Sequence, residues 1–345
     1  MTHHEARSER PRVATVTLNP AIDVTYEVPS LVVDDVVRVT RTTSRAGGKG
    51  VNVAAVASAI GADARVLVLT GGPSGTAFTD GLAALDLDVL AVDALADVRR
   101  TVVVVAHDGT TTSLQEPGHD VREPQTTARQ VLEAVDRLLA EGVSAVAVSG
   151  SLPPGCPVSL LTDVVARFLS GGVPVVVDTS GEALASVVRS GAILTPNRSE
   201  LVEMLGESAP EPFGANGLDE AWTVAAARRL LSEGAPAVLV TLGADGILAV
   251  TPDGTFAARP PQAVFGNPTG AGDAAVAALL VHLAAAGDPA AVRWTEALAD
   301  MVATSAACVL RPVAGEVDHT ARAAWLPQVR VRATTPPTDQ EDLPT

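Results

Sequence analysis

The stretch Asn267-Pro268-Thr269-Gly270-Ala271-Gly272-Asp273 stands directly before an apolar helical run, Ala274 to Ala286. A helix start offers unpaired N–H donors and a partial positive charge, so this segment predicts a phosphate site. Gly270 and Gly272 have no side chain that would block a phosphate. A carboxylate such as Asp273 repels phosphate, but it is needed where a hydroxyl loses its proton to accept a phosphoryl group. The segment therefore predicts phosphoryl transfer to an alcohol.

Two other interpretations of this stretch stay open. Gly270 to Ala275 also fits a loose dinucleotide-binding pattern, although its lead-in, Arg259-Pro260-Pro261-Gln262, does not look like a buried strand. That pattern also requires an acid about 20 residues on, and position 293 is an arginine. A structural glycine-rich turn capped by Asp273 is the second alternative.

Short Val-rich runs alternate with longer helical patterns along the chain. The expected strands are Val13–Leu18, Val66–Thr70, Thr101–Ala106, Ala145–Ser149, Val173–Asp178, Ile193–Thr195, Ala237–Thr241 and Ile247–Val250. The expected helices are Val51–Ile60, Gly75–Ala84, Thr126–Glu141, Ser159–Ser170, Gly181–Arg189, Arg198–Leu205, Asp219–Glu233, Gly272–Ala286 and Ala290–Leu310. This alternation predicts an α/β fold with a mostly parallel central sheet flanked by helices.

Two stretches break the alternation. Val24–Arg45 has the pattern of two strands with no helix between them, and Thr101–Ser113 that of a hairpin turning at Asp108-Gly109. Strands with one wet face are typical of a small antiparallel sheet. We expect a lid, formed from about 24–45 and 99–115, that closes over a substrate and excludes water.

Composition limits the classes of partner. The 345 residues carry a formal charge of −16, which argues against nucleic acid and anionic membranes as partners. Two cysteines, Cys156 and Cys308, show no metal or redox spacing and favour a cytoplasmic location. The polar arm 1–12 and the tail 331–345 are expected to be disordered, which leaves one domain over 13–330.

A second group of residues precedes the first long helix. Arg45-Ala46-Gly47-Gly48-Lys49-Gly50-Val51-Asn52 opens that helix, and Asp23 follows the first strand. Ligands in open α/β sheets bind at the carboxyl ends of strands, so Asp23, Gly48, Lys49 and Asn52 should line one pocket suited to sugar hydroxyls. Arg99 opens a strand, and its fork matches phosphate oxygens. A turn role for Asp23 and solvated surface roles for Lys49 and Arg99 stay open.

Seven motifs follow one another from about residue 13 to about 330. They are Thr17-Leu18-Asn19-Pro20-Ala21-Ile22-Asp23, Gly47-Gly48-Lys49-Gly50-Val51-Asn52-Val53-Ala54, Ser149-Gly150-Ser151-Leu152-Pro153-Pro154-Gly155, Asp178-Thr179-Ser180-Gly181-Glu182-Ala183-Leu184, Pro196-Asn197-Arg198-Ser199-Glu200-Leu201, Thr241-Leu242-Gly243-Ala244-Asp245-Gly246 and Gly270-Ala271-Gly272-Asp273. In this order they resemble the ribokinase-like, phosphofructokinase-B family of carbohydrate kinases. Within it the chain looks most like the branch of 1-phosphofructokinase, tagatose-6-phosphate kinase and the minor 6-phosphofructokinase.

The resemblance implies a Rossmann-like α/β domain with a β lid, lids that pair in a homodimer, and the cofactors ATP and Mg²⁺. It also implies a role for each matching residue. For phosphoryl transfer, Asp273 matches the catalytic base, and Gly270, Ala271 and Gly272 match the anion hole. For the sugar phosphate, the hydroxyl contacts are matched by Asp23, Gly48 and Asn52, and the phosphate contacts by Lys49, Arg99 and Arg38, in a pocket that Ser149 and Ser151 complete. For the nucleotide, Asn197 and Glu200 match the nucleotide and water-mediated Mg²⁺ contacts, and Thr241, Gly243 and Gly246 match the nucleotide loop.

The resemblance predicts an ATP-dependent kinase that converts a ketohexose monophosphate to a bisphosphate. Fructose 1-phosphate is the first choice, with fructose 6-phosphate and tagatose 6-phosphate as alternatives that the sequence does not separate. A non-catalytic sugar-phosphate binding protein is the alternative from another class. One departure favours it: members of this branch often carry a lysine before Pro-Asn, where this chain has Thr195.

Overall fold

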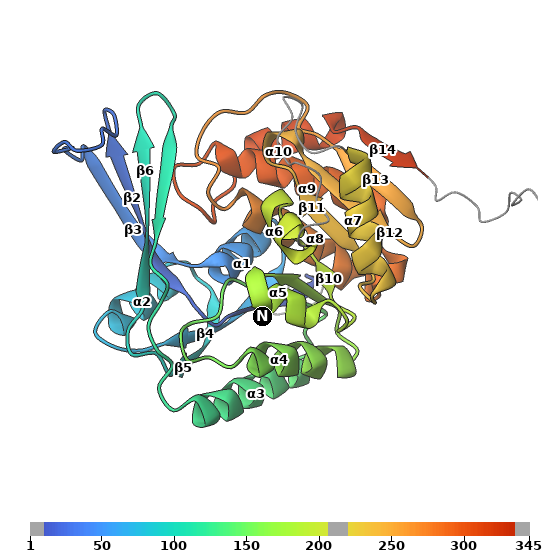
Figure 1. Cartoon of the computed structure of the whole chain (residues 1–345), viewed down its shortest axis with the longest axis horizontal. Coiled ribbons are helices and arrows are strands. Elements are labelled where there is room, and N and C mark those ends of the chain that lie inside the picture. The colour runs from blue at the N-terminus through green and yellow to red at the C-terminus, as the bar shows by residue number, and fades with distance from the viewer. Residues whose placement is uncertain (1–9, 206–219, 335–345) are drawn as a thin grey trace, which may run out of the picture.

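The computed structural model describes residues 10–205 and 220–334 (Figure 1). Its main body contains a ten-stranded sheet in the order β14-β13-β12-β11-β10-β9-β8-β1-β4-β5. The strands are β1 (Arg12–Thr17), β4 (Asp63–Thr70), β5 (Asp88–Asp93), β8 (Ala145–Ser149), β9 (Val175–Asp178), β10 (Ile193–Leu194), β11 (Val238–Thr241), β12 (Ile247–Thr251), β13 (Gly254–Ala258) and β14 (Val331–Thr334). From β5 to β11 every neighbouring pair is parallel, and the last three pairs are antiparallel. The predicted α/β class is confirmed.

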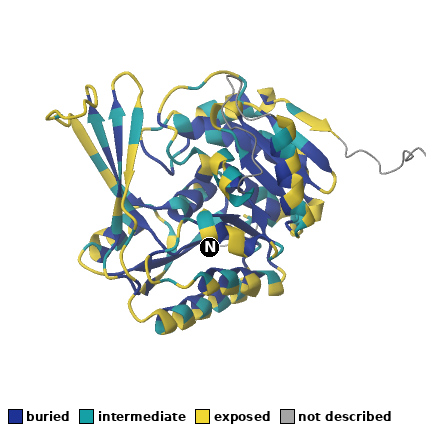
Figure 2. Cartoon of the chain, in the orientation of Figure 1, coloured by how far each residue is buried: buried dark blue, intermediate teal, exposed yellow. Residues whose placement is uncertain are grey.

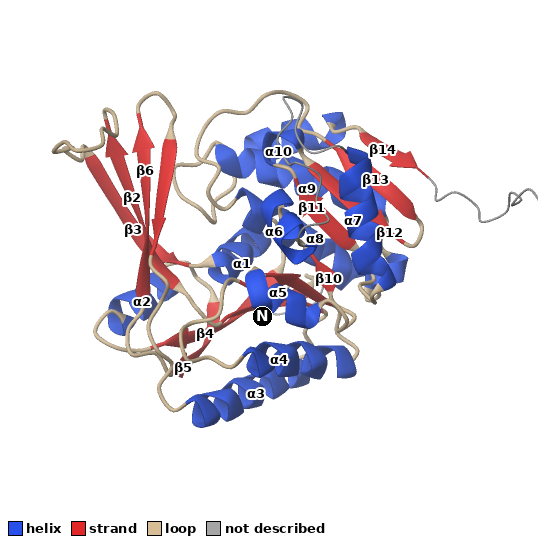
Figure 3. Ribbon diagram, in the orientation of Figure 1, coloured by secondary structure: helices blue, strands red, loops and turns tan. Residues whose placement is uncertain are grey.

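Helices cover both faces of this sheet (Figure 3). They are α1 (Lys49–Ala59), α2 (Gly75–Ala83), α3 (Pro124–Ala140), α4 (Val158–Ser170), α5 (Gly181–Val187), α6 (Arg198–Leu205), α7 (Glu220–Ser232), α8 (Ala271–Ala286), α9 (Trp294–Val309) and α10 (His319–Trp325). Val13 of β1 packs in the core cluster of α1, α8 and α9, and the next residue, Ala14, packs in that of α3, α4 and α7. Successive side chains of a strand therefore point into two different apolar cores, one on each face of the sheet. Figure 2 shows the buried strands between the two layers of helices.

The order of the strands reverses beside β1. The chain passes from β1 to β4 on one side and later returns with β8 on the other side of β1. In open α/β sheets, a crevice for ligands forms at such a point, outside the carboxyl ends of the strands. The fold therefore places the ends of β1, β8, β9, β10 and β11 around one crevice.

A second sheet stands away from the main body, at the left of Figure 1. It consists of β2 (Ala21–Val28), β3 (Arg41–Gly47), β6 (Arg99–Ala106) and β7 (Thr111–Gln115) in the order β3-β2-β6-β7. The predicted lid strands are confirmed, but the prediction of a purely antiparallel sheet is wrong, since β2 and β6 run parallel. The reason is topological: β2 continues from β1 and β6 follows β5, and these strands leave the main sheet in the same direction.

Several boundaries differ from the sequence-based expectation. β5, β13, β14 and α10 were not predicted, and β1 begins at Arg12, inside the expected arm. The expected disorder from residue 331 is wrong for 331–334, because this polar segment pairs with β13 as an edge strand. Backbone hydrogen bonds hold such a strand, so its side chains show little periodicity. Residues 1–9 and 335–345, and Asp219 of an expected helix, lie outside the described residues.

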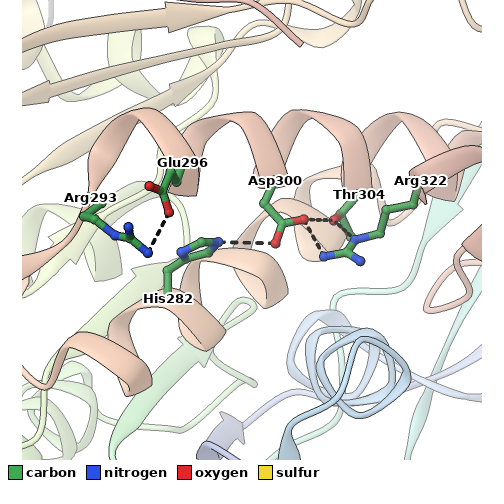
Figure 4. Close-up of polar contacts among 6 residues, drawn as sticks. All are labelled: His282, Arg293, Glu296, Asp300, Thr304 and Arg322. Atoms are coloured by element: carbon green, nitrogen blue, oxygen red, sulfur yellow. Dashed lines mark hydrogen bonds and ion pairs between the residues drawn. The ribbon is translucent and has the colours of Figure 1, made fainter. Parts of the chain in front are cut away.

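A polar network fixes the helix that begins at Ala271 against its neighbours (Figure 4). Asp300 of α9 pairs with His282 of α8 at 3.3 Å and with Arg322 of α10 at 2.6 Å. Thr304 donates to Asp300 and accepts from Arg322 Nε. A buried charge that is paired and hydrogen-bonded in this way holds three helices in one register.

In the residues that the structure describes, no helix is long and apolar enough to cross a bilayer.

Candidate active site

A cleft of about 420 Å³ opens at the carboxyl ends of the parallel strands, under the lid. Its lining comes from nine segments far apart in the sequence: Asp23, Gly48, Lys49, Asn52, Arg99, Thr101, Gln115, Gly150, Ser151, Asp178, Thr179, Ser180, Thr195, Asn197, Glu200, Thr241, Thr269, Gly270, Gly272, Asp273 and Val276. A larger hollow of about 750 Å³ beside β12 and β13 contains neither Asp273 nor the glycine loops. The chemistry of the lining, rather than size, identifies the candidate site.

The helix start at Gly270 has the geometry of an anion site. Gly270 caps α8 with a φ of 84°, a left-handed conformation that favours glycine. The Ala271 N–H donates to the Pro268 carbonyl and closes the turn, so Ala271 does not line the cleft. Gly272 does, and a Cβ there would meet open space. A phosphoryl group can therefore approach the first turn of α8 without displacing a side chain.

Asp273 lies buried in that first turn. Burial and the charge of Asp178 raise the pKa of Asp273 to about 7, against the opposing effects of Lys49 and Asn52. Asn52 Nδ2 donates to Asp273 Oδ2 at 3.0 Å, and the Asn52 side chain also hydrogen-bonds Asp23. Burial raises the pKa of Asp23 to about 6. A carboxylate with a pKa near neutrality suits a general base, because it ionises readily and still holds a proton firmly.

Lys49 lies among carboxylates. Its ammonium is 3.1 Å from Asp178 Oδ1, at the end of β9. Burial opposes the charge on Lys49, but Asp178, Asp273 and Glu200 outweigh it and raise the pKa of Lys49. The lysine therefore stays cationic at the floor of the cleft. Its predicted contact with the sugar's phosphate stays a prediction, and the structure places it beside Asp178 instead.

Asn197 and Glu200 bind each other across the first turn of α6. The Asn197 N–H donates to Glu200 Oε2 at 2.8 Å, and the Glu200 N–H donates to Asn197 Oδ1 at 2.9 Å. This is a reciprocal capping arrangement, which accounts for the spacing of the two residues by itself. Burial raises the pKa of Glu200, with the Asn197 hydrogen bond and Lys49 opposing. Both residues line the cleft, so the cap also presents a carboxylate to a ligand.

The lid contributes the opposite wall. Arg99 opens β6, and its Nη1 donates to the Glu116 carbonyl at 2.7 Å while its guanidinium faces Asp23. Ser151 is fixed from below, since its Oγ accepts a hydrogen bond from Asn19 Nδ2 at 3.0 Å. Thr101 and Gln115 from neighbouring lid strands complete this wall. An arginine, a carboxylate and several hydroxyl and amide groups are suited to a phosphorylated sugar.

Four other predicted residues do not line the cleft. Arg38 is exposed in the loop between β2 and β3, and Ser149 is buried at the end of β8. Gly243 is the first residue of a short 3-10 turn, and Gly246 follows the end of that turn. Thr241, just before the turn, does line the cleft. The structure thus brings together the predicted base, the predicted sugar contacts and the Asn-x-x-Glu pair in one cleft, and leaves these four residues outside its lining.

Sequence reasoning gave no role to Asp178, although the motif around it was recognised. The signal was present: Asp178 directly follows the buried run Val175–Val177, and a polar residue at the carboxyl end of a parallel strand faces the crevice. Thr101 and Gln115 carried no such signal, because their position depends on the pairing of β6 with β7.

Comparisons with known proteins agree with this geometry. The family model of pfkB family carbohydrate kinases matches residues 14–317. Phosphofructokinase-2 from Escherichia coli, in complex with fructose-6-phosphate, is 27% identical with a TM-score of 0.78, and the match covers 92% of this chain and 98% of that one. A possible 1-phosphofructokinase and a ribokinase, both from Thermotoga maritima, share the fold at 22% and 19% identity, with TM-scores of 0.79 and 0.67. The matches cover 94% and 92% of this chain, and 100% and 99% of those chains. The chain belongs to the pfkB family of carbohydrate kinases, phosphotransferases that act on an alcohol group.

Proposed function

We propose that this protein transfers the γ-phosphoryl group of ATP to a hydroxyl of a ketohexose monophosphate and forms a bisphosphate. The observation that carries the proposal is the buried Asp273 at the start of α8, joined through Asn52 to Asp23 on the lid. One amide thus links a base beside an anion site to a carboxylate suited to a sugar hydroxyl. This arrangement supports the proposal, because a sugar hydroxyl held by Asp23 and a phosphoryl group at the start of α8 would meet at the same carboxylate, Asp273.

The reaction would use these residues in turn. Arg99 holds the phosphate already on the sugar, and Asp23 and Asn52 hold its hydroxyls. Asp273 takes the proton of the attacking hydroxyl through the oxygen that Asn52 does not occupy. The first turn of α8 and Lys49 stabilise the negative charge on the phosphoryl group in transfer. Closure of the lid excludes water, which would otherwise compete as acceptor.

The donor set at the floor of the cleft fits Mg²⁺. That ion takes oxygen ligands and is usually bound by one or two carboxylates together with phosphates and water. Glu200 and Asp178 are the carboxylates placed for this, since Glu200 spends one oxygen on the Asn197 N–H and Asp178 one on Lys49. When bound, the ion would neutralise phosphate charge beside these acids.

Fructose 1-phosphate is our first candidate substrate, because the Asn19–Asp23 and Gly47–Asn52 motifs together look most like 1-phosphofructokinase. Fructose 6-phosphate is the second candidate. It is favoured by the likeness, at 27% identity, to phosphofructokinase-2 in complex with fructose-6-phosphate. The same side chains can serve both isomers at slightly different angles.

An ADP-release assay tests the proposal. Purified protein with ATP and Mg²⁺ should turn over at least one of fructose 1-phosphate, fructose 6-phosphate and tagatose 6-phosphate, and free fructose much more slowly. Binding of a sugar phosphate without turnover of any would show a non-catalytic binding protein. Equal turnover of free fructose would show that no group reads the phosphate.

We also propose a homodimer through the lids. Large apolar side chains are exposed on the loop from β2 to β3 and on β7: Leu31, Val32, Val33, Val36, Val39 and Leu114. Exposed apolar side chains on the lid sheet and on the loop that joins two of its strands are suited to a second copy of the same lid. Sedimentation of the protein and of a Val33→Asp, Val36→Asp variant tests this, and equal masses would contradict it.

A further inference from the structure

Side chains of the lid and of α1 meet at Gly315, in the loop after α9. Arg45 lies on β3 opposite Asp23, and its Nη1 donates to the Ala314 carbonyl. Its Nη2 is buried and has no hydrogen-bond partner among the described residues. The same holds for Asn52 Oδ1 within the described chain. A Cβ at residue 315 would lie 2.9 Å from each of these two atoms, so they are at most twice that distance apart.

The two atoms are chemically complementary. Arg45 Nη2 offers N–H donors and Asn52 Oδ1 is an acceptor; the two atoms are not hydrogen-bonded to each other, but the separation allows one water to bridge them. The other end of the Asn52 amide faces both carboxylates, because its NH₂ donates to Asp273 at 3.0 Å and also interacts with Asp23. A reversed amide would turn its oxygen toward two carboxylates and its NH₂ toward a guanidinium. The arginine and the two carboxylates therefore favour one orientation.

We propose that Arg45 is a positioning residue for phosphoryl transfer, which holds the Asn52 amide with its NH₂ toward Asp23 and Asp273. This deepens the proposed function and rests on it for its kinetic consequences. The segment Ala314-Gly315, to which Arg45 is hydrogen-bonded, also packs against the start of α8, since a Cβ on Gly270 would lie 2.8 Å from Ala314 Cβ. Arg45 thus connects a lid strand to the base and to the start of α8.

The consequence concerns the proton on Asp273. Asp273 is faced by three charged groups, which are Asp178 from β9, Lys49 from α1 and Asp23 from β2. Arg45 is faced by the carboxylates of Asp23 and Glu316 and by the thiol of Cys308 from α9. The Asn52 hydrogen bond favours the ionised form of Asp273. Without Arg45 the amide loses its fixed orientation, and Asp273 should ionise at higher pH.

The test is Arg45→Met, with the exposed Arg41→Met on the same strand as matched control. Titration of the Asp273 carboxyl by ¹³C NMR, assigned through Asp273→Asn, should move upward by about one pH unit in Arg45→Met. The acid limb of kcat should move with it and kcat should fall about 10- to 100-fold, while Arg41→Met leaves both unchanged. Arg45→Lys keeps the charge but loses the fork, so a smaller upward shift is expected.

Non-additivity shows the route. If Arg45 acts through Asn52, Arg45→Met should add nothing to the shift already caused by Asn52→Ala. An unmoved titration, or full additivity in the double variant, overturns the proposal. If Arg45→Met does not fold, Arg45→Lys is judged by the same two criteria. Because the NMR titration needs no substrate, a shift in a protein that phosphorylates no sugar would refute the proposed function, while the orientation of the Asn52 amide by Arg45 would still hold.

Discussion

The two walls of the cleft have opposite electrostatic character. On the lid wall, Arg99 faces one carboxylate, Asp23, which Arg45 also faces from outside the lining of the cleft. On the floor, Asp178, Asp273 and Glu200 surround one cation, Lys49. The lid wall can hold a dianionic sugar phosphate directly, whereas an ATP polyphosphate would be repelled by the floor. We infer that the nucleotide needs a divalent cation to enter and the sugar phosphate does not.

The strongest way to break this contrast is to remove the base. Asp273→Asn should lower kcat by about 10² to 10⁴ with little change in the sugar-phosphate KM, because a positioned general base acts on the transition state. The variant should also melt at a higher temperature. Burial raises the pKa of Asp273 from 3.8 in the unfolded chain to about 7 in the folded protein. The folded state therefore loses stability as pH rises from 3.8 to 7, and an uncharged asparagine avoids that loss. The gain should be larger at pH 8 than at pH 5.

The exposed carboxylate of Asp80 on α2 provides the control for this variant. Asp80→Asn should leave kcat and the melting temperature unchanged. Retention of more than about a tenth of wild-type kcat by Asp273→Asn would show that the base is elsewhere.

A pair of cation variants separates the walls. Arg99→Met should raise the sugar-phosphate KM by about 10- to 100-fold, from the loss of charge-assisted hydrogen bonds, with the ATP KM nearly unchanged. Lys49→Met should act mainly on kcat, since its ammonium pairs with Asp178 beside the base. Steady-state kinetics with each substrate varied in turn measures both. A rise in sugar-phosphate KM for Lys49→Met equal to that for Arg99→Met would place Lys49 on the sugar's phosphate.

The pH dependence sharpens the same contrast. Asp273 must be ionised to take a proton, so kcat should fall about tenfold per pH unit below its pKa of about 7. Burial raises the pKa of Asp23 to about 6. If Asp23 binds the sugar as we propose, its protonation should make kcat/KM fall more steeply than kcat at low pH. Profiles from pH 5 to 8.5 test this, and the same limb in Asp273→Asn would assign it to another group.

The two walls also differ in how well the sequence predicts them. Each charged group on the floor stands at a strand end or a helix start, which a local motif in the sequence can reveal. Sequence patterns therefore predict Asp273, Asn197 and Glu200, and they were sufficient to predict Asp178. The lid wall depends on pairing between distant segments. The parallel contact of β2 with β6 sets Ala21 beside Arg99, and no local pattern encodes it. Arg45 was quoted in a motif, but its contact with Ala314 joins residues 269 positions apart.

A variant at Thr195 tests whether Lys49 takes the place of the lysine that the resemblance leads us to expect before Pro196-Asn197. Thr195 is buried after β10, its N–H donates to the Val177 carbonyl, and it is therefore beside Asp178, the partner of Lys49. A new cation near a polyphosphate would contribute on the order of 1 kcal/mol, so Thr195→Lys should lower the ATP KM several-fold at most. In the Thr195→Lys single variant, the new lysine and Lys49 would compete for Asp178 and repel each other. In the Lys49→Met background Thr195→Lys should instead restore part of the lost kcat, and less of it at high salt. ATP titrations of the four variants at two ionic strengths measure this, and an equal gain in both backgrounds would mean that the two positions serve different phosphates.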